Sequence, residues 1–331
     1  MTKDTSTEAD ANTRPVDPKD LPDYAPIPKA VFGPALNEHG YQVGQVEKNL
    51  YWVSDNIYMS AFLITSDGVV LFDTPPNIGH NLQRAVDEIA AANGTSNKVT
   101  HIIYSHHHAD HTGASSLFGK DVVRIGHERT RELMLRENDP ERPAPEETFK
   151  DHRTLEIGGE RIELDWHGTG HSPDNIYIHF PDHNTLMLVD IVNPGWAPIY
   201  QSNLTEDVQG YLAAPDIALG YKWEHFIGGH LGKLGTRKDI ELHKQYMADV
   251  VECARNALAT VNPAPYFGRY PENVWAGVRA YLDTVTAATA APVIEKYKDV
   301  LGAADVYTAS TSFHVMQSLR LDLGVGTQVH P

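Results

Sequence analysis

A cluster of histidines and one aspartate follows directly after the apolar stretch VTHIIY. In an extended segment, side chains two residues apart point the same way, so His106 and His108 can face one point while His107 faces away. Asp110 and His111 follow where the chain turns toward a helix, and they can address a second point nearby. Imidazole and carboxylate are ligands that Zn²⁺ accepts in proteins. The pattern HxHxDH therefore predicts a metal site, and a surface patch of histidines is the alternative interpretation.

Three further candidate ligands occur later in the chain, each where an apolar stretch stops. His171 lies in the glycine-flanked turn GTGHSPDN, Asp190 ends the stretch TLMLVD, and His230 follows HFIGG. Functional side chains gather in the loops where strands end, at one edge of a sheet. Each of these residues alone would be an ordinary turn or cap residue. Together, and in this order after HxHxDH, they predict additional metal ligands.

These motifs resemble those of the metallo-β-lactamase-fold hydrolases, and the similarity extends over roughly residues 41–235. The resemblance implies an α/β fold, an αββα sandwich of two mixed β-sheets flanked by helices, here with a C-terminal helical extension. It also implies a dinuclear metal site at one edge of the two sheets. The implied ligands are His106, His108 and His171 for one ion and Asp110, His111 and His230 for the other, with Asp190 bridging the two.

Asp73 ends the stretch GVVLFD and precedes two prolines. In the family, the aspartate at this point of the pattern lies near the metals and orients a ligand without binding an ion, as metal-bound imidazoles usually require. The alternative is an Asx turn that leads into the prolines. We favour the orienting role.

The implied cofactors are two Zn²⁺ ions per chain, although the same ligand types also suit iron or manganese. Two cations about 3.5–4 Å apart can share one water and lower its pKa toward neutral, and the metal-bridging hydroxide would then attack the substrate. Asp110 is the predicted catalytic residue, because it can hold a metal, position the hydroxide and pass a proton to the leaving group. We therefore expect a metal-dependent hydrolase that forms no covalent intermediate.

Several substrates are compatible with these residues. Zinc β-lactamases of the family usually have a cysteine or a non-ligating residue in place of Asp190 and are usually exported, whereas no export signal is visible here. Both points favour the glyoxalase II-like and lactonase-like branches, which hydrolyse carbonyl esters, lactones and thioesters. The open alternatives are a persulfide dioxygenase-like enzyme with one iron, a hydrolase of β-lactams or of other amide or C–X bonds, and a metal-binding scaffold without turnover.

Substrate contacts are expected from loops around the metal edge. Residues 51–59 and 193–200 are rich in aromatic side chains, and Trp196 could wall an apolar pocket or simply pack on the sheet. Three basic residues follow His230 and could bind an acidic substrate, or they could begin a solvated helix: Lys233, Arg237 and Lys238.

Composition excludes several other classes of protein. The chain has 27 Lys and Arg and 44 Asp and Glu, which gives a net charge of −17. Because such a chain repels the phosphates of nucleic acid, we expect a small-molecule substrate as its partner and no nucleic acid. Cys253 is the single cysteine, which excludes an intrachain disulfide and a zinc site built on several thiolates. No stretch of 18 apolar residues occurs and the chain is acidic, so we expect no membrane association. Because no export signal is visible, we expect a cytoplasmic location.

Apolar periodicity predicts the elements that must position the candidate ligands. The expected strands are residues 41–46, 50–54, 59–65, 68–73, 99–104, 121–126, 153–157, 160–166, 175–180, 185–190 and 225–229. The expected helices are residues 80–92, 128–137, 207–219, 237–260, 273–298 and 303–320.

These elements suggest three parts of the chain. Residues 1–38 are polar and proline-rich and are expected to form an irregular arm. Residues 39–235 would form the catalytic domain, and residues 236–331 a helical part packed on the same domain. The apolar faces of those last helices could cover the domain, shape the substrate pocket or form a homodimer interface.

Overall fold

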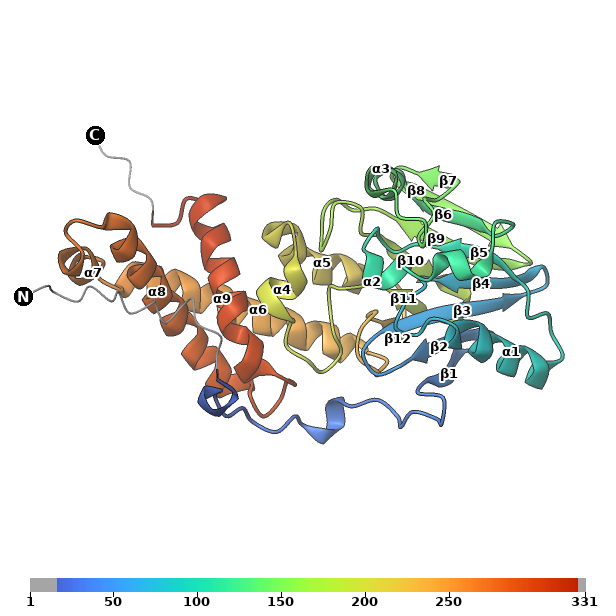
Figure 1. Ribbon diagram of the computed structural model, residues 1–331, viewed down its shortest axis with the longest axis horizontal. Helices are drawn as coiled ribbons and strands as arrows, with labels where there is room; N and C mark the ends of the chain where they lie inside the picture. The colour runs from blue at the N-terminus through green and yellow to red at the C-terminus, as the bar shows by residue number, and fades with distance from the viewer. Residues whose placement is uncertain (1–16, 327–331) are drawn as a thin grey trace, which may run out of the picture.

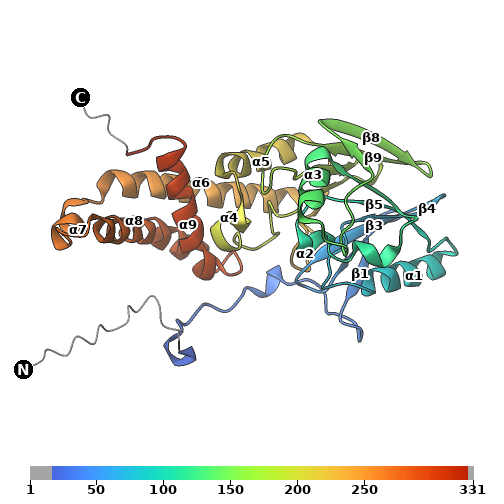
Figure 2. The same cartoon turned by 45° about the horizontal axis from the view of Figure 1, so that its top comes forward.

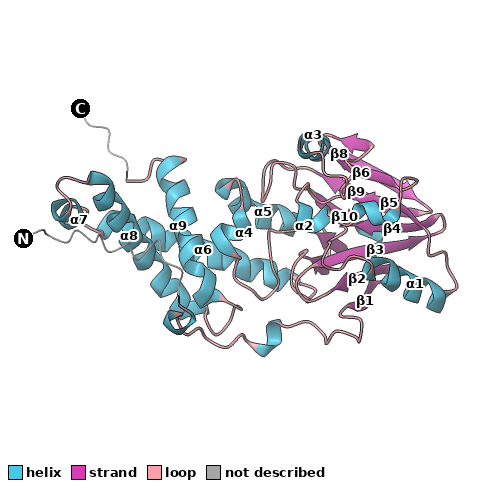
Figure 3. Cartoon of the chain, viewed as in Figure 1, coloured by secondary structure: helices cyan, strands magenta, loops and turns pink. Residues whose placement is uncertain are grey.

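The computed structural model describes residues 17–326 of the chain. In this part, two mixed β-sheets pack face to face and helices cover their outer faces, which confirms the expected αββα sandwich. Figure 3 shows the strands gathered at one end of the molecule and the long C-terminal helices at the other. Residues 1–16 of the expected arm and residues 327–331 of the expected helical part lie outside the described residues.

The strands are β1 (Gln42–Glu47), β2 (Leu50–Ser54), β3 (Met59–Thr65), β4 (Gly68–Phe72), β5 (Val99–Ile103), β6 (Val123–His127), β7 (Glu147–Phe149), β8 (His152–Ile157), β9 (Glu160–Asp165), β10 (Tyr177–Phe180), β11 (Thr185–Met187) and β12 (His225–Ile227). The helices are α1 (Asn81–Asn93), α2 (Ala109–Thr112), α3 (Glu128–Glu137), α4 (Tyr200–Leu204), α5 (Val208–Gly220), α6 (Arg237–Thr260), α7 (Ala264–Arg269), α8 (Val274–Tyr297) and α9 (Ala304–Leu321).

The larger sheet follows the order of the chain, from β1 to β7. Strands β1 to β4 are antiparallel, and β4 to β7 run parallel to one another. Successive side chains of a strand point to opposite faces. Accordingly, Leu50 and Trp52 of β2 pack between the sheets, while Tyr51 and Val53 belong to the apolar layer that includes α1. Both faces of this sheet are therefore buried.

The smaller sheet has the order β12-β11-β10-β9-β8, with only the β11–β12 pair parallel. Its inner face, with Ile162, Ile178 and Met187, completes the core between the sheets. Its outer face packs through Leu186 and Phe226 against a core that also contains residues of α5, α6, α8 and α9. This arrangement leaves the loops at one end of both sheets free to form a site.

The helices after residue 236 extend the molecule away from the sandwich (Figures 1 and 2). Helix α6 begins after Thr236, whose backbone N–H and hydroxyl both donate to the carboxylate of Asp239 in the first turn. Helices α8 and α9 then pack on α6 through a buried cluster that includes Tyr246, Val285 and Val315. No helix in the described part of the chain is apolar over a length that would cross a membrane.

The N-terminal arm, residues 17–40, runs along the outside and joins the helices to the sandwich (Figure 1, blue). The backbone N–H of Ala25 donates to Asp305 of α9 over 2.5 Å, and Val31 is buried. Phe32 meets the ring of Trp196 edge-on, with ring centroids 5.9 Å apart. Gly33 then lies against Gly232, in the loop that follows β12.

Four short elements depart from the expected pattern. Helices α2 and α4 and strand β7 span three to five residues, too few to show a period. Helix α7 lies between the expected helices 237–260 and 273–298, in a proline-containing stretch for which no element was predicted. It can form there because proline fits the cap and first turn of a helix, and Pro263 is the N-cap.

Candidate metal centre

The HxHxDH segment lies where β5 ends and α2 begins. His108 is extended, with φ −60° and ψ 140°, and it is the N-cap of α2. Asp110 and His111 lie within this single helical turn, so their side chains leave the chain in other directions than those of His106 and His108. This change from extended to helical backbone lets six residues address two neighbouring points.

The structure brings all seven candidate ligands together at one end of the two sheets. They form two groups, and within each group one potential ligand atom per residue lies within 4.8 Å of all the others. The groups are His106, His108, His171 and Asp190, and Asp110, His111 and His230. Asp190 thus falls in the first group, where the family resemblance implied a bridging position.

Asp190 nevertheless lies between the two groups. Its Oδ2 is 3.4 Å from Nε2 of His106 and 3.3 Å from Nε2 of His171, both in its own group. The same Oδ2 is 3.2 Å from Nε2 of His111, and Oδ1 is 2.8 Å from Nε2 of His230, both in the other group. A carboxylate with one oxygen shared by both groups can bridge two cations.

The donor atoms fit a pair of metal ions. Nε2 of His171 faces Nδ1 of His108 at 3.0 Å, and Nε2 of His111 faces Nε2 of His230 at 3.1 Å. Nε2 of His106 is buried without a hydrogen-bond partner. Imidazole nitrogens this close share a proton in the metal-free chain, and a cation between them can replace that proton and bind both nitrogens.

The pKa shifts in the metal-free site also favour metal binding. Burial lowers the pKa of His171 to about 4 and holds that of His106 well below its usual range, so both imidazoles are neutral and able to bind a metal. Burial also opposes a charge on His111, but the Asp190 carboxylate outweighs it and raises the pKa of His111 to about 9. In the metal-free chain a proton on His111 compensates Asp190, and a cation would take its place.

Asp73 lies beside the metal-binding segment and binds across the sheet rather than within its own turn. Its Oδ1 accepts a hydrogen bond of 2.8 Å from the backbone N–H of Ser105, the residue before His106. The Asp73 side chain is fully buried, and burial raises its pKa to about 6. The hydroxyl of Ser105 lies 2.9 Å from Nδ1 of His106. Asp73 therefore supports the start of the HxHxDH segment, as an orienting role requires, and does not form the alternative Asx turn.

A second carboxylate ties two ligand-bearing loops together. His107 points away from the metal groups, as expected, and its Nδ1 lies 2.9 Å from Oδ1 of Asp174. Asp174 also accepts hydrogen bonds from Thr130, over 2.7 Å, and from Ser172, over 2.8 Å. The loop that carries His171 is thereby fixed to the loop that carries His106 and His108. Local sequence patterns do not reveal this contact, because Asp174 and His107 are 67 residues apart.

A cavity of about 470 Å³ opens over the candidate ligands. Ligand residues form its floor, and none of the described residues that line it is lysine or arginine. Its lining residues are Ile57, Tyr58, His108, Asp110, His171, Asp190, Ile199, Asn203, Leu204 and His230. The first two belong to the aromatic-rich stretch 51–59, and Ile199 belongs to the stretch 193–200, both expected to contact substrate.

Tyr58 stands beside the ligand group that contains His111 and His230. Its ring lies 4.8 Å from that of His230 and 5.6 Å from that of His111. Burial raises the pKa of Tyr58 to about 12, and the carboxylates of Asp110 and Asp190 act in the same direction. Its phenol therefore stays protonated at neutral pH and can donate a hydrogen bond into the cavity.

Three other residues considered from the sequence lie away from this cavity. Trp196 packs against Phe32, and its Nε1 donates to the carbonyl oxygen of Val31 over 3.2 Å. Arg237 donates to backbone carbonyls at the end of α5, and Lys233 lies 3.7 Å from Asp239. Their interactions are structural, and the described cavity lining gives them no contact with substrate.

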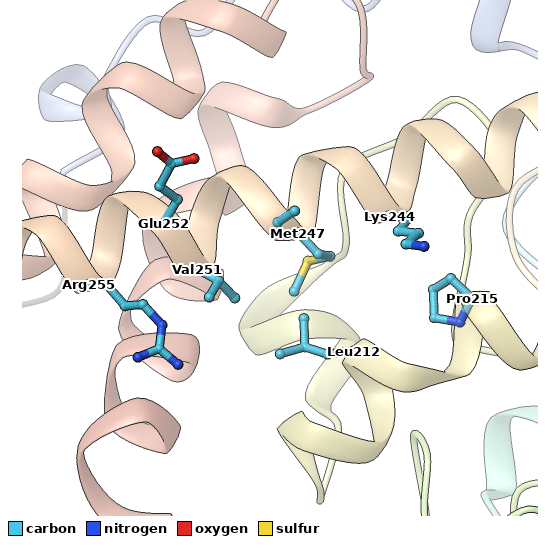
Figure 4. Close-up of a pocket in the computed structure, with 8 residues that line it drawn as sticks. Leu212, Pro215, Lys244, Met247, Val251, Glu252 and Arg255 are labelled. Carbon is cyan, nitrogen blue, oxygen red and sulfur yellow. The ribbon is translucent and has the colours of Figure 1, made fainter. Parts of the chain in front are cut away.

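A second cavity, of about 390 Å³, lies between α5 and α6. Figure 4 shows Leu212 and Pro215 of α5 facing Met247 and Val251 of α6, with Arg255 at one end. Its described lining contains no histidine or aspartate. This groove has no ligand set of its own, so the metal chemistry belongs to the cavity at the sheet edge.

Comparison with known proteins agrees with this geometry. A family model described as "Metallo-beta-lactamase superfamily" matches residues 57–195. The chain is 26% identical to 2,4-dinitroanisole O-demethylase subunit alpha of Nocardioides sp. (strain JS1661), over 70% of this chain and 69% of that protein. It is 31% identical to metallo-beta-lactamase IND-1 of Chryseobacterium indologenes, over 38% of this chain and 51% of that protein.

Solved structures show the same fold. A metallo-beta-lactamase from Pontibacter korlensis superimposes with a TM-score of 0.53 at 20% sequence identity and covers 62% of this chain and 97% of its own. At this identity the likeness concerns the fold alone. The part of this chain that extends beyond such an enzyme corresponds in size to the arm and the helices after residue 236.

Proposed function

We propose that this chain, a metallohydrolase of the metallo-β-lactamase superfamily, uses two zinc ions to hydrolyse a carbonyl ester, lactone or thioester. The observation that carries the proposal is Asp190, which lies within 3.4 Å of four imidazoles at the floor of a cavity with an apolar rim. The complete set of donors supports two ions rather than one, and the carboxylate supports a shared bridging position. The shape of the cavity supports a small-molecule substrate.

When bound, the two ions supply an acidified water and a Lewis acid for the substrate's carbonyl oxygen. The chain's own residues do the rest. Asp110 lines the cavity with 44% of its side chain exposed, so its carboxylate can orient the attacking water and carry a proton to the leaving group. Tyr58 can donate its phenolic hydrogen to an oxygen that gains charge during the reaction.

A second candidate is the hydrolysis of an aryl methyl ether. The relative named 2,4-dinitroanisole O-demethylase subunit alpha matches 70% of this chain, more than the metallo-beta-lactamase IND-1 match covers. An electron-poor aromatic ring would fit an apolar cavity of about 470 Å³. The word subunit in that name further suggests assaying this chain both alone and with a partner chain.

The test combines metal analysis with a substrate panel. Protein purified without chelator should contain close to two metal ions per chain, mainly zinc. We expect hydrolysis of chromogenic esters, lactones or thioesters, with β-lactams, phosphoesters and nitroanisoles as comparison substrates. One tightly bound iron would favour the persulfide dioxygenase-like alternative, and full metal loading without any turnover would favour the non-catalytic scaffold.

A further inference from the structure

Helix α4 is a single left-handed turn at the rim of the cavity. Gln201, Ser202, Asn203 and Leu204 have φ angles of 44°, 58°, 56° and 57°. Residues other than glycine and asparagine seldom adopt this conformation, and they do so singly rather than in a row. No glycine is present in the turn. Contacts from elsewhere in the molecule must therefore impose it.

Helix α9 supplies these contacts. The backbone N–H of Gln201 donates to the hydroxyl of Ser310 over 3.2 Å, and that of Ser202 donates to the hydroxyl of Thr311 over 3.3 Å. Nδ1 of His314 lies 2.7 Å from the carbonyl oxygen of Gln201. Figures 1 and 2 both show α4 lying against α9. Three side chains of one helix thus hold the backbone of the turn.

The other side of α4 is fixed to the metal centre. Nδ2 of Asn203 donates to the carbonyl oxygen of Asp190 over 3.0 Å, and Oδ1 of Asn203 accepts from the backbone N–H of Ile199 over 2.7 Å. The turn is consequently anchored both to α9 and to the residue between the two ligand groups.

This anchored turn presents an apolar side chain to solvent. Leu204 is 64% exposed and lines the cavity, and Ile57, from the loop between β2 and β3, is 55% exposed and lines it too. Exposed apolar side chains gathered at the mouth of a cavity are typical of ligand contacts. Apart from the candidate ligands and the two exposed apolar residues, the cavity is lined by Tyr58, Ile199 and Asn203. These three side chains carry no charge, so they offer no ion-pair partner to a charged group of the substrate that lies away from the bond to be cut.

We propose that α9 selects the substrate through α4. Ser310, Thr311 and His314 act as positioning residues that hold Leu204 at the cavity mouth, where Leu204 and Ile57 receive the alkyl chain or aromatic ring of an uncharged substrate. This inference rests on the proposed function, because it takes the metal centre as the place where the substrate's bond is cut.

The first experiment measures kcat/KM of the metal-loaded protein for p-nitrophenyl esters from acetate to octanoate. The native protein should gain about two- to fourfold per added methylene until the cavity is filled. Leu204→Asp should flatten this dependence and lower kcat/KM for the octanoate at least tenfold. Leu135→Asp is the matched control, because Leu135 is 60% exposed on α3 and does not line the cavity. Ile57→Asp should repeat the Leu204→Asp result.

The second experiment tests the role of α9. Thr311→Val keeps the shape of the side chain but removes the acceptor for Ser202, so KM for the octanoate should rise more than kcat falls. Adding Ser202→Gly should restore KM, because glycine adopts a positive φ without strain. A purely structural defect of α9 would not be repaired by this change in the turn.

A binding measurement separates the two proposals. Hexan-1-ol binding to the metal-loaded protein, followed by NMR, should weaken in Leu204→Asp and stay native-like in Leu135→Asp. If that pattern holds while no ester is hydrolysed, the proposed function fails and the selection by α4 stands. If esters are hydrolysed with the same chain-length dependence in Leu204→Asp as in the native protein, selection by α4 is overturned. Absence of both hydrolysis and alcohol binding would overturn both.

Discussion

Two aspartates show how strongly individual residues of this site are constrained. Asp73 directly follows β4, Asp190 lies three residues after the end of β11, and each has a φ of 64° although neither is glycine. Such a conformation costs about 1–3 kcal/mol per residue and persists where the surroundings enforce it, often at functional sites. Here Asp190 N–H donates to the carbonyl of Gly228 over 3.2 Å, and Asp73 N–H donates to that of Ile103 over 3.0 Å. Backbone strain at both strand ends aims two carboxylates at the ligand cluster.

Replacing Asp110 separates metal binding from turnover. Asp110→Asn keeps one oxygen ligand and the shape of the side chain but removes the base, so we expect most of the metal to remain while kcat falls by about 10²- to 10⁴-fold. Elemental analysis and ester hydrolysis measure the two effects. The exposed Asp121, changed to asparagine, is the control. Turnover equal to that of the control would remove Asp110 from the mechanism.

His243 makes the stability of the fold depend on pH. It is 3% exposed in α6, neither ring nitrogen has a hydrogen-bond partner, and burial lowers its pKa to about 3 from an ordinary 6.5. Below about pH 6.5 the unfolded chain takes up a proton at His243 that the folded chain does not, so stability present above that pH is lost as the pH falls toward 3. The loss is about 1.4 kcal/mol per pH unit.

We therefore expect His243→Leu to lose less unfolding free energy than the native protein between pH 7.5 and 5.5. Urea unfolding of both proteins in metal-free form measures this, since contributions from other groups cancel in the difference. Parallel pH dependences for the two proteins would contradict the assignment to His243.

At the scale of elements, short segments held by distant ones build the mouth of the site. Each left-handed residue of α4 costs about 1–2 kcal/mol, and hydrogen bonds from α9 offset part of that cost. The loop after β12 is also held in place by segments that are distant in the sequence. Leu231 N–H donates to the carbonyl of Ile57 over 3.0 Å, and the arm packs Gly33 against Gly232.

Gly33→Ala tests whether the arm supports His230. A Cβ on Gly33 would lie 1.7 Å from the carbonyl oxygen of Gly232, two residues after His230, so the arm or the loop must move. We expect a loss of stability of about 1–3 kcal/mol and easier removal of metal from the ligand group that contains His230. Thermal unfolding and chelator competition measure the effects. Gly220→Ala is the control, because nothing lies within 4 Å of its added Cβ, and equal behaviour of the two variants would contradict the prediction.

At the scale of the whole molecule, the metal centre joins parts of the fold that have separate cores. Its candidate ligands come from both sheets' loops, and α4 connects it to the C-terminal helices. Residues of the smaller sheet share one apolar core with α5, α6, α8 and α9, so the extension is continuous with the sandwich. A change at the metal centre should therefore alter the free energy of unfolding of the whole described structure.

Removing the metals should lower the melting temperature of the protein. Ligand present at about a hundredfold over its Kd stabilises a fold by about 2.7 kcal/mol, which corresponds to about 4 °C for a chain of 331 residues. Calorimetry with a chelator, followed by readdition of zinc, measures the shift and its reversal. An unchanged melting temperature in fully metal-free protein would show that folding does not depend on the ions.

The sequence by itself was enough to predict the sandwich and to single out the candidate ligands. Strand and helix periods are local, and β2, β3, α3 and α6 occupy the residues that their periods predicted. The spacing HxHxDH is local too, and His171, Asp190 and His230 could be added because each ends an apolar stretch. The assignment of these ligands to two metal ions came from the resemblance to a family, because short-range geometry cannot provide it.

The tertiary structure alone decided what surrounds the ligands. Ser202 and Thr311 are 109 positions apart, and His107 and Asp174 are 67 apart, so no local pattern records either contact. Four successive left-handed residues without glycine contradict what their own types favour, and only packing against α9 stabilises them. Backbone periods are set by neighbours along the chain, whereas the mouth of this cavity is set by neighbours in space.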